Sequence, residues 1–258
     1  MKVAVLVENT TINENLACEH GLSLYIETDQ HKILFDMGQT DLFAENARKL
    51  GIDLAEVDVA ILSHGHYDHG GGLQTFLEIN KKAPVYISKH AFGAYYNGTE
   101  KYIGLDVSLR ESKRLVYTDE VVEIADGLTL FHCNERAKSY NLGSFGLNKE
   151  MENRFEEDDF LHEQYLCIEE HGEKFLISGC SHKGILNIVE WFKPNVLIGG
   201  FHFSKLPLDG TLENYAKILN EYGTAYYTCH CTGIEQYEFM KKSTKKLSYI
   251  AVGDIINI

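Results

Sequence analysis

The sequence predicts an α/β fold in which mixed β-sheets pack against helices. Short runs of β-branched and aliphatic residues, bounded by turn-forming residues, recur along the chain and are typical of strands. Segments with apolar residues at helical spacing fall between these runs, and this alternation is typical of α/β proteins. Two consecutive strands are joined only by Glu170-His171-Gly172-Glu173, which predicts a hairpin and therefore a sheet that is not purely parallel.

The expected elements follow in chain order. The segments with the composition of strands are 2–7, 22–27, 32–35, 57–62, 85–88, 164–169, 174–178, 195–198, 225–228 and 249–252. The segments with helical spacing are 41–50, 73–80, 185–192, 212–222 and 234–242. Asp41 stands at the expected N-cap of the first helix, where a carboxylate can accept hydrogen bonds from the first backbone N–H groups.

Residues 135–160 differ from the rest of the chain. The part from Glu150 to Asp159 is dense in charge and lacks periodicity, which predicts a solvated loop before the hairpin. Two interpretations stay open, a connector and a lid that faces the substrate. No internal repeat or linker divides the chain, so we expect a single domain over residues 1–258.

Net charge limits the classes of partner. The 258 residues contain 24 Lys and Arg against 38 Asp and Glu, which gives a formal charge of −14. Such a surface repels phosphate backbones, and the basic clusters are confined to 81–82 and 241–246. We therefore expect a small-molecule substrate rather than nucleic acid. The oligomeric state is left open, with a homodimer as one possibility.

The N-terminal segment and the apolar runs bear on location. Glu8 ends the first apolar run too early for the core of a signal peptide, and no run approaches the ~18 residues that span a bilayer. We therefore expect a cytoplasmic protein without a membrane segment. In that reducing compartment the six cysteines are expected to be packed residues, ligands or nucleophiles rather than disulfides.

The segment Ser63-His64-Gly65-His66-Tyr67-Asp68-His69-Gly70-Gly71-Gly72 holds potential metal ligands directly after an expected buried strand. His64 and His66 project to one side because alternate residues of extended backbone share a face. A turn at Tyr67 then brings Asp68 and His69 to a neighbouring point. These ligands are too many for one open catalytic metal, which predicts two metal ions a few Å apart.

This segment resembles the HxHxDH motif of the metallo-β-lactamase superfamily. The resemblance implies a four-layer αβ/βα sandwich with two mixed sheets and with the metals at one edge between the sheets. It also implies further ligands from distant segments. These are His162 before the hairpin, with Glu163 as its competitor, Cys180 after the second hairpin strand, and His202 after a later strand.

Cys180 stands where most members of the superfamily have a bridging Asp. A thiolate is a soft ligand that favours zinc over magnesium or manganese, although packing of Cys180 as a buried thiol is the alternative. His182 follows two residues later and is expected either to bind metal or to shuttle protons. The expected metal ligands are therefore His64, His66, Asp68, His69, His162, Cys180, His182 and His202.

Two other segments fit a substrate site. Thr228-Cys229-His230-Cys231-Thr232-Gly233 follows a strand and opens a helix, so its N–H groups and the Thr232 hydroxyl could hold an anion. Substrate binding by His230, Thr232 and Gly233 is the favoured interpretation, and metal ligation or a structural role for the CxC pair are alternatives. Glu19 and His20 lead into a strand and are expected to contact substrate, with a structural role equally open.

The combined motifs resemble the branch of the superfamily related to dihydropterin ribofuranosylaminobenzene phosphate synthase, over about residues 1–255. They predict a dinuclear metal-dependent hydrolase, most simply with zinc and with iron or manganese as alternatives, that acts on a small phosphorylated or ester-type substrate. Asp68 is the expected proton acceptor and His182 the expected proton donor. The alternatives are a metal-assisted transferase or condensing enzyme on a pterin- or phosphoribosyl-like substrate, and a non-catalytic metal or redox protein. Diiron members of the fold often have Glu where this chain has His66, which favours zinc.

Overall fold

The computed structural model describes all residues from 1 to 258. The chain divides into two compact units, each of which is described by itself. Unit 1 contains residues 1–119, 146–164 and 251–258, and unit 2 contains residues 120–145 and 165–250.

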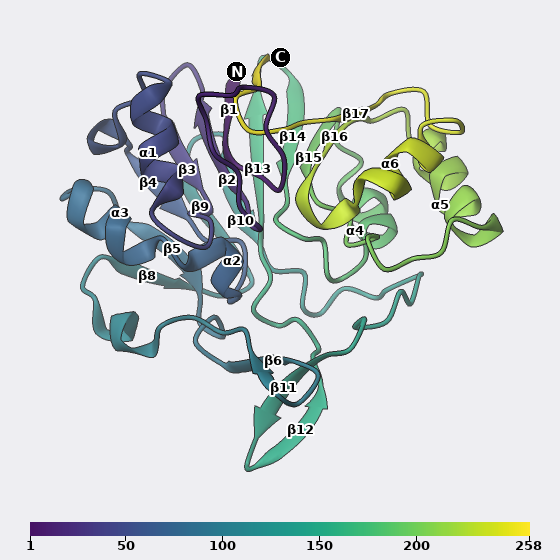
Figure 1. Ribbon diagram of the computed structural model, residues 1–258, viewed down its shortest axis with the longest axis horizontal. Coiled ribbons are helices and arrows are strands. Elements are labelled where there is room, and N and C mark those ends of the chain that lie inside the picture. The colour runs from purple at the N-terminus through teal and green to yellow at the C-terminus, as the bar shows by residue number, and fades with distance from the viewer. The chain divides into compact units, whose positions relative to one another are not determined.

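The larger sheet of unit 1 is mixed. Its seven strands run in the order β18-β1-β2-β3-β4-β5-β8 (Figure 1). Their bounds are β1 Lys2–Val7, β2 Ser23–Glu27, β3 Lys32–Phe35, β4 Val59–Ile61, β5 Val85–Ser88, β8 Leu115–Thr118 and β18 Ile255–Asn257. Pairing is antiparallel from β18 to β3 and parallel from β3 to β8. This mixture matches the predicted kind of sheet.

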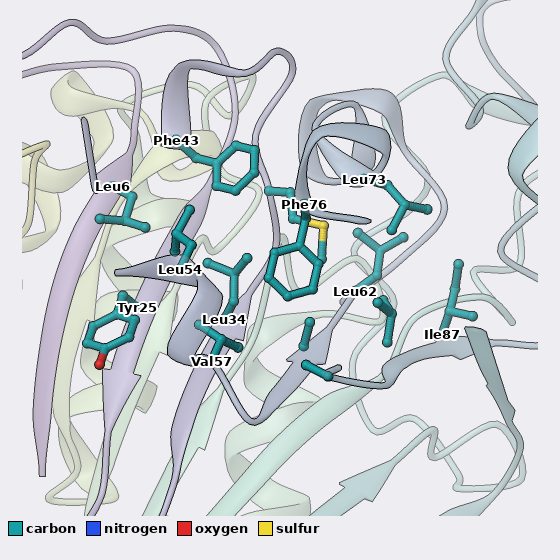
Figure 2. Packing of buried hydrophobic residues seen from close by; sticks show 14 of the residues in the cluster. Leu6, Tyr25, Leu34, Phe43, Leu54, Val57, Leu62, Leu73, Phe76 and Ile87 are labelled. Atoms are coloured by element: carbon teal, nitrogen blue, oxygen red, sulfur yellow. The ribbon is translucent and has the colours of Figure 1, made fainter. Parts of the chain in front are cut away.

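Helices cover one face of this sheet and close a core over it. They are α1 (Leu42–Lys49), the single turn α2 (Tyr67–Gly70) and α3 (Leu73–Ile79), with 3₁₀ turns at Leu54–Glu56 and Val107–Glu111. Figure 2 shows Phe43 of α1 and Phe76 of α3 pointing toward Leu6 and Leu34 of the strands. These side chains are fully buried, so removal of apolar surface from water holds the helices on the sheet.

A second, smaller sheet of unit 1 corrects the prediction of a solvated loop from Glu150 to Asp159. Its order is β12-β11-β6-β7. The bounds are β6 Ala94–Asn97, β7 Lys101–Tyr102, β11 Leu147–Met151 and β12 Arg154–Glu157. All four residues of β12 are exposed, so the hairpin lacks the apolar alternation that identifies strands in a sequence. Its turn at Glu152-Asn153 has positive φ at both residues, as two-residue hairpin turns of type I′ require.

Unit 2 is built on the other seven-stranded sheet, in the order β17-β16-β15-β14-β13-β10-β9. The bounds are β9 Val121–Ala125, β10 Leu128–Phe131, β13 Tyr165–Glu170, β14 Glu173–Ile177, β15 Val196–Gly199, β16 Ala225–Thr228 and β17 Leu247–Tyr249. Strands β14 to β17 are parallel and the remainder antiparallel. Helices α4 (Ile185–Phe192), α5 (Gly210–Glu221) and α6 (Ile234–Met240) share its core with these strands (Figure 1).

Most predicted elements are confirmed, with ends that shift by one or two residues. The predicted hairpin is β13–β14, and its turn at His171-Gly172 has positive φ at both residues. The last predicted strand, 249–252, is wrong in position because β17 ends at Tyr249. Asp41 lies at the N-cap of α1 but makes no capping hydrogen bond, and the Thr40 hydroxyl accepts one from the Leu42 N–H instead.

The carboxyl ends of parallel strands gather polar residues within each unit. In unit 1, Asp36 follows β3, and Ser63 and His64 follow the neighbouring strand β4. In unit 2, Cys180, His202 and Cys231 follow the neighbours β14, β15 and β16. Because adjacent parallel strands end at one edge, residues far apart in sequence come close together there. No helix of the chain is long and apolar enough to cross a bilayer.

The core of unit 1 supports a matched stability test. Replacing buried Phe76 with Ala leaves a cavity beneath α3 and is expected to lower the free energy of unfolding by ~3–5 kcal/mol. Ile79 lies on the same helix with 39% of its surface exposed, so Ile79→Ala is expected to change stability by no more than ~0.5 kcal/mol. Urea unfolding followed by circular dichroism measures both. Equal losses in the two variants would show that the Phe76 core does not hold α3.

Candidate functional site

The histidine-rich motif of unit 1 forms a buried cluster after β4. His64, His66, Asp68 and His69 are all buried, and α2 carries the last two. The His64 ring centroid lies 4.5 Å from that of His66 and 4.1 Å from that of His69. The loop approaches its surroundings closely, since a Cβ on Gly65 would lie 2.2 Å from the Ala91 carbonyl oxygen. The structure therefore brings these four predicted ligands of the motif together.

Asp36 anchors this cluster from beneath. Its buried carboxylate accepts hydrogen bonds from the Ser63 N–H and the Ser63 hydroxyl, both at 2.7 Å, and pairs with His69 Nδ1 at 2.7 Å. An ionised carboxylate carries no proton, so His69 must donate from Nδ1. His69 then carries its lone pair on Nε2, the nitrogen through which it would bind a metal.

Ser63 connects Asp36 to His64 and thereby fixes the position of the proton on the His64 ring as well. The Ser63 hydroxyl gives its only proton to Asp36, so its contact with His64 Nδ1 at 2.8 Å requires His64 to donate. His64 then carries its lone pair on Nε2. One buried carboxylate thus fixes the tautomers of two imidazoles in the orientation that metal binding requires.

His162 lies in unit 1 with the cluster, and its two nitrogens have protein partners. The Gly65 N–H donates to Nδ1 at 2.9 Å, so the neutral ring carries its proton on Nε2, which faces Asp158 Oδ2 at 3.1 Å. In this orientation His162 positions the Asp158 carboxylate rather than offering a lone pair. Its role as a direct ligand stays a prediction, as does that of its buried neighbour Glu163.

Asp158 is a second carboxylate, besides Asp36, that the sequence analysis did not single out. It is buried and its Oδ2 lies 4.0 Å from His66 Nε2. Burial raises the pKa of Asp158, but the hydrogen bonds from His162 and from the Phe160 N–H outweigh it and leave the pKa lowered. Burial, aided by His162, lowers the pKa of His66 to about 3. At neutral pH Asp158 is therefore charged and His66 neutral, as metal ligation requires.

Asp68 contacts His20, whose side chain is exposed to solvent. Its Oδ2 lies 3.1 Å from His20 Nε2 and 4.0 Å from His69 Nε2, and the His20 side chain is 56% exposed. Glu19 instead accepts hydrogen bonds from the backbone of Gln39 and Thr40 and from the Thr40 hydroxyl. The structure thus brings His20 to the cluster, whereas Glu19 holds the loop before α1. Substrate binding by either residue stays a prediction.

Unit 2 holds a second group of potential ligands. The donor atoms of Cys180, His202 and Cys231 all lie within 4.8 Å of one another. His182 is buried beside them, with its ring centroid 4.4 Å from that of His202. The predicted pair of alternatives, Cys180 and His182, therefore lies in one region of unit 2.

The segment at the start of α6 is arranged differently from the predicted anion site. The Thr232 hydroxyl is buried, accepts a hydrogen bond from the Phe201 N–H at 2.9 Å and contacts the Thr228 hydroxyl. Gly233 has φ +82 and caps α6, while His230 is buried in the preceding 3₁₀ turn. These contacts join the ends of β15 and β16, and substrate binding by Thr232, Gly233 and His230 stays a prediction.

A pocket in unit 1 adjoins the histidine cluster. Its volume is about 370 Å³, and Lys89, Arg110 and Lys149 line it together with Tyr95 and Asp159. The Tyr95 ring centroid lies 4.0 Å from that of His162, so the pocket and the cluster share a wall. Lys149 pairs with Asp159 at 2.5 Å and Lys89 pairs with Asp119, whereas the Arg110 guanidinium donates to the Phe92 carbonyl oxygen at 2.9 Å. Glu150 also lines the pocket, so Arg110 is its cation that is bonded to a backbone carbonyl rather than to a carboxylate.

Three residues in these groups were missed or given little weight in the sequence. Asp36 is a single carboxylate after a strand, and Asp158 lies within the charge-dense segment, where neighbouring carboxylates hide it. Cys231 belongs to a CxC pair, for which ligation was only one alternative.

The donors in both units fit divalent ions. Unit 1 supplies imidazoles with fixed tautomers and buried carboxylates, including a group of His66, Asp158 and His162 atoms within 4.8 Å of one another. Unit 2 supplies imidazole and sulfur. Mixed nitrogen, oxygen and sulfur donors of this kind suit zinc and related transition metals.

The chain belongs to the metallo-beta-lactamase superfamily, whose family model matches residues 17–223. This membership, together with the two mixed sheets, confirms the predicted fold class. A solved metal-dependent hydrolase of the beta-lactamase superfamily is 30% identical and covers 100% of this chain and 99% of its own, with a TM-score of 0.85.

Curated relatives extend the comparison over the whole chain. An uncharacterized protein of Methanocaldococcus jannaschii is 31% identical over 271 residues, covering 99% of this chain and 100% of its own length. The 7,8-dihydropterin-6-methyl-4-(beta-D-ribofuranosyl)-aminobenzene-5'-phosphate synthase of the same organism is 28% identical over 286 residues, covering 99% and 96%. The predicted resemblance to this branch of the superfamily is confirmed.

Asp36→Asn tests whether this carboxylate fixes the imidazoles. Either orientation of the amide turns an N–H group toward a donor, the Ser63 N–H on one side or Ser63 and His69 on the other. We expect affinity for Zn²⁺ to fall by about 10–100-fold, as for other residues that orient metal ligands. Competition with a chromogenic chelator measures it.

Asp41→Asn is the matched control, because the exposed Asp41 side chain makes no capping hydrogen bond. Its affinity should equal that of the unmodified protein. If Asp36→Asn also keeps full affinity, the tautomers do not depend on Asp36.

Proposed function

We propose that this protein is a dinuclear metal-dependent hydrolase of a small anionic substrate. The observation that carries the proposal is the hydrogen-bond network of Asp36, Ser63, His64 and His69. It places a proton on Nδ1 of both buried imidazoles and therefore the lone pair of each on Nε2. Membership in a superfamily with metal-dependent hydrolases supports it.

We assign two divalent ions to each chain, most simply Zn²⁺. In unit 1 the ligands are drawn from His64, His66, Asp68, His69 and Asp158, with His162 holding Asp158 in place. In unit 2 they are drawn from Cys180, His182 and His202. Bound divalent ions supply a water of lowered pKa and polarise the oxygen of the bond to be cleaved.

We assign proton transfer to Asp68, His20 and His182. Asp68 is placed to accept a proton, and His20 at 3.1 Å links it to solvent because the His20 ring is largely exposed. An imidazole has one nitrogen that can accept a proton and one that can donate, so the His20 ring can pass the proton outward. His182 in unit 2 is assigned as proton donor to the leaving group.

The pocket of unit 1 points to the substrate class. Arg110 lines the pocket and donates to a backbone carbonyl, whereas Lys89 and Lys149 are paired with carboxylates, so the Arg110 guanidinium favours a compact anion such as a phosphoester or carboxylate over a neutral molecule. Arg110 can bind two oxygens of such a group in a bidentate manner, as Lys cannot. The pocket volume suits a small molecule.

Condensation is the second candidate, and the likeness to the phosphate synthase over 99% of this chain favours it. Product analysis in ¹⁸O-labelled water separates the two reactions. Hydrolysis places one labelled oxygen in the product, whereas condensation requires a second organic substrate and incorporates no label from water.

The activity test uses His66→Ala and Asp68→Asn against a panel of phosphoesters, lactones and thioesters. We expect each variant to lower kcat/KM by at least ~100-fold, because one loses a ligand and the other loses the proton acceptor. His31→Ala is the control, since His31 is outside both ligand groups. Full turnover in His66→Ala and Asp68→Asn would exclude metal-dependent hydrolysis at this cluster.

A further inference from the structure

Unit 2 brings together two cysteines that the sequence separates by 51 positions. Cys180 follows β14 and Cys231 follows β16, with β15 and His202 between them in the sheet. Both cysteines are buried, and the donor atoms of the three residues lie within 4.8 Å of one another. Two sulfurs that each lie about 2.3 Å from a tetrahedral ion are about 3.8 Å apart, so this spacing is compatible with one shared ion.

The backbone leaves room for the Cys231 sulfur at this point. A Cβ on Gly200 would lie 2.4 Å from Cys231 Sγ, so any residue other than glycine would displace the sulfur. The φ of Gly200 is outside the left-handed region, so its backbone conformation alone does not call for glycine. The glycine is thus explained by the sulfur that packs against it.

We propose that Cys231 is a metal ligand which, with Cys180 and His202, forms a two-thiolate site for a soft divalent ion. This inference rests on the proposed metal binding and deepens it, because it adds a ligand and states which ions unit 2 selects. Two thiolates and one imidazole leave a fourth position of a tetrahedral ion open to another ligand. They also favour zinc, cobalt or cadmium over magnesium and manganese.

The contacts of Cys231 distinguish it from another buried cysteine of unit 2. Its Sγ lies within hydrogen-bonding distance of the Cys180 carbonyl oxygen, at 3.6 Å, so the side chain is directed toward the Cys180 end of β14. Cys167 on β13 provides a contrast within the same unit. Burial raises its pKa to about 11, so it stays a thiol.

His202 adds an independent observation. Its Nδ1 atom is buried and makes no hydrogen bond within the protein. The residue also has φ +57, a left-handed backbone that is strained for a non-glycine residue and that clusters at ligand sites. This conformation places an imidazole beside both sulfurs at the end of β15.

The test replaces the native ion with Co²⁺ in the full chain and records the thiolate-to-cobalt charge-transfer band. Its intensity scales with the number of bound thiolates, so Cys231→Ser and Cys180→Ser should each remove about half of it, and the double variant all of it. Cys167→Ser is the matched control and should leave the band unchanged. Cobalt bound per chain is measured in each sample.

A measurement on the unmodified protein covers the case in which a variant does not fold. The ¹¹³Cd chemical shift of the cadmium-loaded protein reports the number of thiolates, and we expect the shift of a two-thiolate site. Gly200→Ala should move this signal, since it displaces Cys231 Sγ.

The outcomes separate the two proposals. Bound cobalt with a band that Cys231→Ser leaves intact, or a cadmium shift typical of one thiolate, would overturn the inference and leave the hydrolase proposal standing. Failure of the unmodified protein to bind either ion would overturn both.

Discussion

The buried Asp36 carboxylate is the interaction on which the rest of the site depends. A charged group fully removed from water is costly unless hydrogen bonds replace its hydration, and Asp36 receives them from Ser63 and His69. Those same bonds decide which nitrogen of His69 and, through Ser63, of His64 carries the proton. The hydrogen bonds that stabilise the buried Asp36 charge are thus the same ones that orient His64 and His69 for binding a cation.

The parallel strand pairs explain why each ligand group forms without being local in sequence. Adjacent strands end together, and the residues after them turn sharply, so Asp36, Ser181, His202 and His230 all have positive φ. Each such conformation costs of order 1 kcal/mol for a non-glycine residue. The burial of large apolar side chains under the helices of each unit offsets this cost, so the cores stabilise conformations that the loops alone would not keep.

Sequence reasoning predicted the elements with strong apolar periodicity and the ligands grouped in one motif. It missed the β11–β12 hairpin because exposed strands bury no regular face, so their charged residues look like a loop. It missed Asp36 and Asp158 because a single carboxylate becomes informative only when its partners are known. Cys231 was weighed lightly for the same reason, since its proximity to Cys180 arises from strand order and not from spacing along the chain.

The central claim is that the preset imidazoles, carboxylates and thiolates hold two divalent ions. Elemental analysis of protein purified without oxygen tests it most directly, because it counts and identifies the ions together. We predict two zinc ions per chain, which a chelator removes. Protein that is fully folded yet retains no metal, or that holds two irons with a visible absorption band, would contradict the claim.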